Sequence, residues 1–185
     1  MDADERLVNL LGACALALAD RLQAATERAL GEQGASAAAL VTIAQYPGGS
    51  IEELRRALGR THSATVRVVD RLVARGWVRR EAGARGPAVA LVATPTGVEQ
   101  AQAVLCARWR ELRAAVGDRV PRDLAAALEQ ILARITPDTA AGDRICRLCH
   151  AGACPQARCP VARRQRELGV APAEPVHLCV VTIGS

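Results

Sequence analysis

Apolar and polar positions divide the chain into long helical patterns toward its two ends and a short, turn-rich middle. From Asp4 to Leu30 apolar residues recur with a helical period and alanine fills most other positions, which predicts one long helix. Its apolar stripe is wider than one small core needs, so we expect this helix to pack against a partner. A second helix is predicted from Ser36 to about Tyr46, where a Pro-Gly-Gly sequence breaks the chain.

Two short helical patterns joined by a tight turn follow. Apolar residues recur at helical spacing from Ile51 to Leu58, and Gly59 can end this helix in the left-handed conformation. Thr61 or Ser63 can cap a second helix, which continues to Arg75. Two helices joined by so short a turn predict a helix-turn-helix. The positions of the second helix expected to face inward are Val66, Val69, Leu72 and Val73, and those expected to face solvent are Ala64, Arg67, Asp70, Arg71 and Arg75.

A β-hairpin and two further helices complete the pattern. Residues 77–81 and 88–93 are predicted strands, and residues 82–87 (AGARGP) form the loop between them. Helices are predicted over residues 94–116 and, beginning at a proline in a first-turn position, over residues 121–135. The predicted fold class is therefore mainly α with a small β-hairpin, which forms the wing of a winged helix-turn-helix.

The positive charge of the chain lies in this middle part. Residues 51–85 hold nine Arg against four acidic residues, a balance of +5 that equals the net charge of all 185 residues, and the other fifteen Arg are matched by fifteen acids. Such a module favours a polyanion as its partner. Phe is absent and only one Tyr and two Trp are present, so duplex DNA is favoured over stacked single strands. The candidate contact residues are Arg60, Thr61, His62, Ser63, Ala64, Thr65, Arg67, Arg71, Arg80 and Arg85.

The sequence from Ala39 to Gly97 resembles the winged helix-turn-helix of MarR-family transcription regulators. The resemblance implies a sequence-specific regulator of double-stranded DNA, a repressor that binds a pseudo-palindromic operator as a homodimer and responds to a small-molecule or redox effector. It places the helix Ser63–Arg75 in the major groove and the wing in the minor groove. The family wing carries an Asp-x-Arg pair, whereas the nearest positions here read Arg-Gly-Pro, and Arg85 is expected to take over its contact.

The chain divides accordingly into three regions. A MarR-like domain is expected over residues 1–138, with the DNA-binding module at about 36–95 and dimerisation helices at about 4–30 and 96–136. A cysteine-rich, metal-binding knob is expected over residues 143–162, and residues 163–185 form a tail.

The knob carries the second informative motif, Cys-x2-Cys-x4-Cys-x4-Cys. Its members are Cys146, Cys149, Cys154 and Cys159. The spacing resembles a zinc knuckle with Cys154 in the position of the usual His, which favours one structural zinc ion. The final Cys-Pro pair is also typical of iron-sulfur proteins, and metal-free reactive thiols are a third interpretation. The last two interpretations would make the protein a metal-responsive or redox-responsive regulator.

The remaining residues give little support to an enzyme. Cys14 and Cys106 lie on apolar helix faces, where Cys is usually a small core residue. No Ser-His-Asp arrangement or phosphate-binding glycine loop is visible, so no catalytic activity is expected. No segment approaches the roughly 20 uninterrupted apolar residues of a membrane helix, and a cytoplasmic protein is expected. A second hypothesis is a protein interaction module, in which the knob docks another protein and the winged helix is structural.

Overall fold

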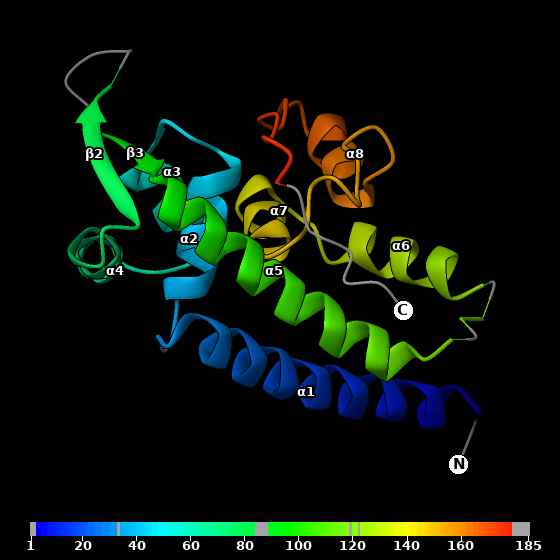
Figure 1. Cartoon of the computed structure of the whole chain (residues 1–185). Coiled ribbons are helices and arrows are strands. Elements are labelled where there is room, and N and C mark those ends of the chain that lie inside the picture. Colours follow the sequence, from blue (N-terminus) through cyan, green and yellow to red (C-terminus); the bar gives the residue numbers. More distant parts are fainter. Residues whose placement is uncertain (1–2, 33, 84–88, 119, 122, 179–185) are drawn as a thin grey trace.

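The computed structural model describes residues 3–32, 34–83, 89–118, 120–121 and 123–178. Over these ranges the chain forms eight helices and one three-stranded antiparallel sheet, as the sequence predicted for a mainly helical fold (Figure 1). The sheet and α4 lie at one end of the molecule, and α1 extends away from them. In chain order the elements are α1 (Ala3–Leu30), α2 (Ser36–Gln45), β1 (Gly49–Ser50), α3 (Ile51–Leu58), α4 (His62–Ala74), β2 (Val78–Ala82), β3 (Val89–Ala93), α5 (Pro95–Val116), α6 (Leu124–Arg134), α7 (Thr139–Cys146) and α8 (Pro160–Glu167).

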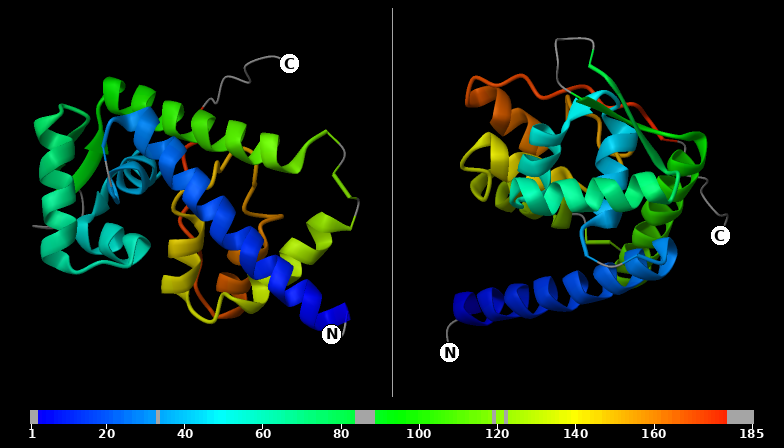
Figure 2. Two further views of the ribbon diagram at one scale, coloured as in Figure 1. Left: turned by 90° about the horizontal axis from the view of Figure 1, so that it is seen from below. Right: turned by 90° about the vertical axis from the view of Figure 1, so that its left-hand side faces the viewer.

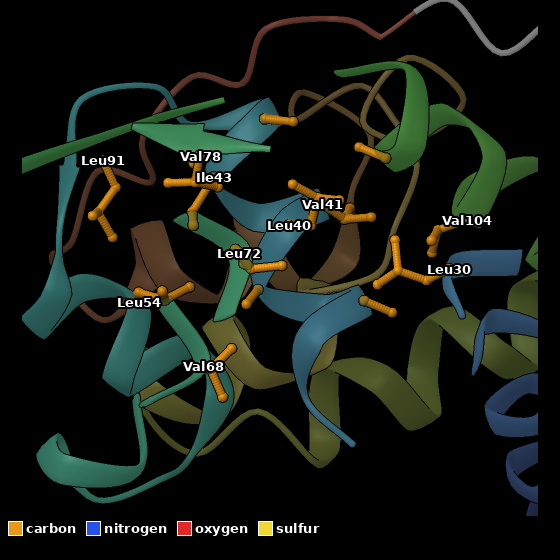
Figure 3. Packing of buried hydrophobic residues seen from close by; sticks show 14 of the residues in the cluster. Leu30, Leu40, Val41, Ile43, Leu54, Val68, Leu72, Val78, Leu91 and Val104 are labelled. Carbon is orange, nitrogen blue, oxygen red and sulfur yellow. The ribbon is translucent and has the colours of Figure 1, made fainter. Parts of the chain in front are cut away.

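The helix α2 forms the centre of the main hydrophobic core. Nearly all of its residues are buried, and Leu40 and Val41 are completely inaccessible to solvent. Leu72 of α4, Leu91 of β3 and Val104 of α5 belong to the same buried cluster, and Figure 3 shows Leu72 near Leu40 with Leu91 and Val104 toward opposite sides. Because α2 is covered on several sides, the small helices and the sheet are held in fixed positions around it.

The C-terminal half of α1 packs against α5, and Figure 2 shows the two helices diverging toward the N-terminus of α1. Glu111 of α5 forms an ion pair with Arg21 of α1, in which Oε2 of Glu111 lies 3.0 Å from Nη2 of Arg21. Toward the N-terminus the apolar stripe of α1 stays exposed, at Leu7, Val8, Leu10, Leu11 and Leu16. The length and apolar composition of α1 would be sufficient for a membrane span, which the sequence prediction did not anticipate. Its longest run without a charged residue is nevertheless shorter than the roughly 20 residues of a membrane helix.

The helix-turn-helix is bounded by the caps that its sequence provides. Gly59 ends α3 in the left-handed conformation, and the Thr61 hydroxyl accepts the Ala64 N–H at the start of α4, as predicted. Ser50 and Glu53 form a capping box at the start of α3 that the sequence analysis missed. The helix α4 runs one residue earlier than predicted at both ends.

The strand β2 begins and ends one residue later than predicted. The strand β3 begins one residue later than predicted and ends where predicted. β2 pairs with β3 from Val78 opposite Ala93 to Ala82 opposite Val89. The two-residue strand β1, on the other side of β3, was not predicted because two residues show no alternating pattern. The tip of the wing, with Arg85, lies outside the described residues.

Beyond α5 the structure departs further from the sequence prediction. The helix α6 begins at Leu124 and not at Pro121, which lies in a turn before it. The helices α7 and α8 were not predicted, because each is short and the cysteine spacing concealed their pattern. Asp138 caps α7 by accepting the Ala141 N–H at 2.7 Å. The helix α7 packs on α3, and α8 packs on α6 and α7.

Candidate nucleic-acid interface and cysteine cluster

The helix α4 presents a polar face to solvent along its length. His62, Ser63, Arg67 and Arg71 are exposed there, and Ala64 is half-buried. Thr65, a predicted contact residue, is fully buried and donates its hydroxyl to the Thr61 carbonyl at 3.0 Å. It therefore cannot reach a ligand at this face, and the prediction for Thr65 is wrong.

The inward face of α4 also differs from the prediction by part of a turn. Thr65 and Val68 are buried together with Val69 and Leu72. Val66 and Val73, both predicted to face inward, are only half-buried. A threonine can lie in the core here because its hydroxyl is satisfied within the helix.

Several of the arginines around α4 are held by acidic partners. Arg80 of β2 lies 2.6 Å from Asp70 of α4, which joins the wing to this helix. Glu32, just after α1, lies 2.7 Å from Arg75 and 3.9 Å from Arg71. Arg75 also lies over the Trp77 ring, 5.6 Å from its centroid.

Two other arginines are free to meet a ligand. Arg67, on the exposed face of α4, and Arg60, in the turn before it, are exposed and form no ion pair with the part of the chain that the structure describes. The start of α4 also carries the partial positive charge of a helix N-terminus, which favours a nearby phosphate. This end of α4 therefore combines these two arginines with a helix N-terminus, an arrangement that favours an anionic ligand.

The wing adds further positive charge next to α4. Arg79 and Arg80 are exposed on β2, and Arg79 lies 2.7 Å from Glu81 on the same strand. Arg80 is thus positioned beside α4 by Asp70, as a contact to DNA backbone next to the major groove would require. The contact predicted for Arg85 concerns a residue outside the described ranges.

The four cysteines of the C-terminal motif lie together between two helix ends. Cys146 is the last residue of α7, and the Cys149 N–H donates to its carbonyl at 2.9 Å. Cys159 immediately precedes α8 and is buried, whereas Cys154 is exposed. The thiol of Cys146 is hydrogen-bonded to those of Cys149 and Cys159, and the thiol of Cys154 to that of Cys159. All four thiols are therefore connected.

Hydrogen bonds between these thiols shift their pKa values in different directions. The Cys146 thiol donates to its neighbours, which raises its own pKa and lowers the pKa values of Cys149 and Cys159. Backbone N–H groups at the start of α8 lower the pKa of Cys159 further. Burial and the neighbouring Cys159 raise the pKa of Cys154. Cys149 and Cys159 are therefore the thiols that ionise most readily.

The thiols touch in pairs and do not converge on one point. Among the described residues, no group of three or more His, Cys, Asp or Glu side chains is arranged to hold a metal ion. The predictions of zinc and of an iron-sulfur cluster therefore stay predictions. His150 is not available as a substitute ligand through Nε2, which lies 2.9 Å from the Leu178 carbonyl oxygen. Cys14, expected in the core, is exposed on α1 of this chain, and Cys106 is half-buried.

The cysteine segment contacts the DNA-binding module at points that sequence reasoning missed. The Gln45 side chain, at the end of α2, donates to the Cys149 carbonyl and accepts the Ala151 N–H, both at 3.0 Å. The Gln45 carbonyl accepts the Val176 N–H at 2.7 Å. A buried glutamine at the end of a mostly apolar helix was the one available signal, because a buried amide needs hydrogen-bond partners.

The helix-turn-helix part of the chain has a recognised family match. Residues 31–86 match the model of the MarR family, whose members are transcription regulators and not enzymes. The match covers α2, β1, α3, α4 and β2, and the cysteine segment lies outside it. No curated protein sequence matches the chain.

Solved structures with the same architecture cover most of the chain. A MarR family transcriptional regulator from Streptomyces coelicolor, solved in complex with DNA, is 27% identical over 73% of this chain and 87% of its own, with a TM-score of 0.61. The YusO protein from Bacillus subtilis is 18% identical over 72% and 99%, with a TM-score of 0.58. A MarR family regulator from a Rhodococcus species is 18% identical over 73% and 95%, with a TM-score of 0.56. At these identities the last two likenesses show the fold alone.

Proposed function

From the match of residues 31–86 to the MarR family and the basic face of α4, we infer that this protein is a transcription regulator that binds double-stranded DNA sequence-specifically. In this proposal α4 enters the major groove and the wing lies along the adjacent minor groove. The regulator acts in the cytoplasm and represses transcription by occupying an operator.

The observation that carries the proposal is the arrangement of charge on and around α4. Arg67 is exposed and without an ion pair to the described residues, so its guanidinium can donate two hydrogen bonds to a guanine edge. Arg60 and the N-terminus of α4 are suited to phosphate contacts. Arg80, held by Asp70, supplies a cation beside the helix. The Streptomyces coelicolor relative, solved in complex with DNA, supports the assignment by similarity.

We further propose that the protein is a homodimer. The exposed apolar residues of α1 form a surface that a single chain leaves in water, and Trp109 and Val116 of α5 are also exposed. Contiguous apolar surface of this kind is typical of an interface between chains. Two copies related by a two-fold axis would present two α4 helices, which predicts a pseudo-palindromic site with half-sites about one DNA turn apart.

Operator selection from random duplexes tests the proposal. We expect the purified protein to enrich a pseudo-palindrome and to bind it about 10³-fold or more tightly than random DNA at physiological salt. Light scattering should give twice the mass of one chain, and Leu10→Asp should shift the protein toward the monomer and weaken operator binding. Equal affinity for all duplexes would contradict the proposal and favour the protein interaction module.

A further inference from the structure

The cysteine cluster is a set of metal-ligating side chains that the proposed DNA-binding function does not use. Cys146 and Cys159 belong to a small hydrophobic cluster with Ile145 of α7, Val161 of α8 and Leu132 of α6. Two elements separated in sequence thus bring their thiols together in a partly buried place. Cys149 and Cys154 lie in the connection between these elements and complete the set.

The number and chemistry of the thiols suit one small ion, although as they stand they touch in pairs and, among the described residues, do not surround a common point. A tetrahedral Zn²⁺ with Zn–S bonds of about 2.3 Å holds its sulfurs about 3.8 Å apart, a separation typical of thiols in hydrogen-bonding contact. The four thiols already form such a connected chain, from Cys149 through Cys146 and Cys159 to Cys154. A four-iron cluster separates its cysteine sulfurs further than this contact allows.

The surroundings of the thiols suit thiolate ligands. Cys159 lies at the N-terminus of α8, where backbone N–H groups and the helix dipole stabilise a negative sulfur. The positive charges of Arg108 and Arg147 act on Cys149 in the same direction. Four thiolates around a divalent cation leave a net negative charge, and these donors and cations offset part of it.

The segment that carries the thiols lies against the helix-turn-helix. The helix α7 packs on α3. At Gly59, which ends α3, an added Cβ would lie 2.7 Å from Cδ of Arg144 in α7. The Thr42 hydroxyl of α2 donates to the Arg147 carbonyl at 3.4 Å, and Gln45 holds the backbone around Cys149. The order of the cysteine segment is therefore linked to the turn that precedes α4.

We propose that Cys146, Cys149, Cys154 and Cys159 together bind one structural zinc ion, which holds α7 and α8 against α2 and α3 of the DNA-binding module. Binding replaces the hydrogen bonds between thiols by Zn–S bonds, and each thiol that still carries a proton releases it to solvent. The four sulfurs must move from contact in pairs to contact with one ion, and the ion itself supplies the attraction that draws them together. With four protein ligands the site is closed, so the ion is structural.

Metal analysis of the full chain, purified anaerobically without chelator, tests the site. We expect about one zinc per chain, and no iron or sulfide, in the wild-type protein. Cys149→Ser and Cys154→Ser should each lose most of the zinc. Cys14→Ser is the matched control, because it removes an exposed thiol from α1, and it should keep the full zinc content.

Hydrogen exchange and limited proteolysis test the link to the helix-turn-helix. In Cys149→Ser, backbone amides of α7 and of α3 should exchange about tenfold faster or more. Backbone amides of α1 and α5 at their mutual contact should keep their protection. The segment beyond Asp143 should become sensitive to protease. A wild-type protein without zinc, a brown protein with iron and sulfide, or zinc retained in both Ser variants would overturn the site. Loss of zinc without faster exchange in α3 would overturn the link.

The expected effect of zinc on operator affinity rests on the proposed function. If α4 reads an operator, loss of zinc should weaken operator binding by about tenfold, because the turn before α4 loses its support. The metal and exchange measurements contain no DNA, so the two ideas fail separately. A protein that binds zinc as expected and selects no operator would contradict the proposed function and leave the zinc site standing.

Discussion

Arg80 on the wing strand β2 donates through Nη2 to Oδ1 of Asp70 on α4, across 2.6 Å. This ion pair holds the wing and the proposed recognition helix in one orientation. We expect Asp70→Asn to cost less than about 1 kcal/mol of stability in urea unfolding, because both side chains are partly exposed.

The same change should strengthen binding to random DNA and steepen its salt dependence by about one counterion, since an acidic group beside the phosphates is removed and Arg80 is released. Asp118→Asn is the control, because Asp118 pairs with Arg113 at the far end of α5. Weaker DNA binding by Asp70→Asn would contradict this interpretation.

Arg67 and Arg71 lie one turn apart on α4 and should read bases. Arg67→Ala should cost about 1 to 3 kcal/mol of operator affinity and relax the sequence preference at one position. Arg71→Ala should do the same to a smaller degree, because Glu32 already holds part of its charge. Arg75→Ala, at the C-terminal cap of α4, is a control that should change stability but not base preference. If neither Arg67→Ala nor Arg71→Ala alters binding to operator or random DNA, the proposed docking of α4 is wrong.

Arg85 is the one cation that the sequence places in the wing loop. Arg85→Ala should lower DNA affinity and reduce the slope of log K against log salt by about one counterion, without altering the selected major-groove sequence. Arg134→Ala, at the end of α6, serves as the control of equal charge. A slope equal to that of the wild-type protein would argue against a wing contact.

Gly97 lies in the first turn of α5, where it closely approaches the backbone of Trp77, the residue before β2. A Cβ at this position would lie 1.9 Å from the Trp77 carbonyl oxygen, which belongs to backbone and cannot rotate away. Gly97→Ala should therefore destabilise the protein by about 3 kcal/mol or more in urea unfolding. Gly12→Ala, where no atom lies within 4 Å of the added Cβ, should instead be neutral or stabilise α1 by about 0.5 to 1 kcal/mol. Equal effects of the two changes would contradict the close approach at Gly97.

Asp143 of α7 has a raised pKa because burial disfavours its charge. A carboxyl group that binds its proton more tightly in the folded state adds stability below its ordinary pKa of about 3.9 and loses that contribution as pH rises through the folded value. Asp143→Asn keeps an oxygen that can accept from Gln165 Nε2, which lies 3.2 Å from Asp143 Oδ1, and does not ionise. The wild type should therefore lose stability relative to Asp143→Asn as pH rises from about 3 to about 7, so the difference in free energy of unfolding should shift in favour of the variant. A difference between the two proteins that is independent of pH would contradict the burial effect.

The sequence predicted the DNA-binding module well because its signals are local. Gly59 and Thr61 mark the turn through backbone conformation and side-chain capping, and neither depends on distant residues. Thr65 was misplaced because an apolar pattern cannot show that a hydroxyl will be satisfied inside the helix. The position of the cysteine segment could not be predicted, because it depends on Gln45 and Gly59, more than eighty residues earlier in the chain.

The hydrogen bonds of Gln45 join residues that are 104 and 106 positions apart in the chain. Such distant contacts form late, since the entropy of closing a long loop must be overcome first. During synthesis, α2 can pack with α3, α4 and α5 while its buried amide still lacks partners. The helix-turn-helix should therefore pass through a compact nascent state in which the buried Gln45 amide lacks hydrogen-bond partners. It should reach full stability only after residues 149–151 have left the ribosome.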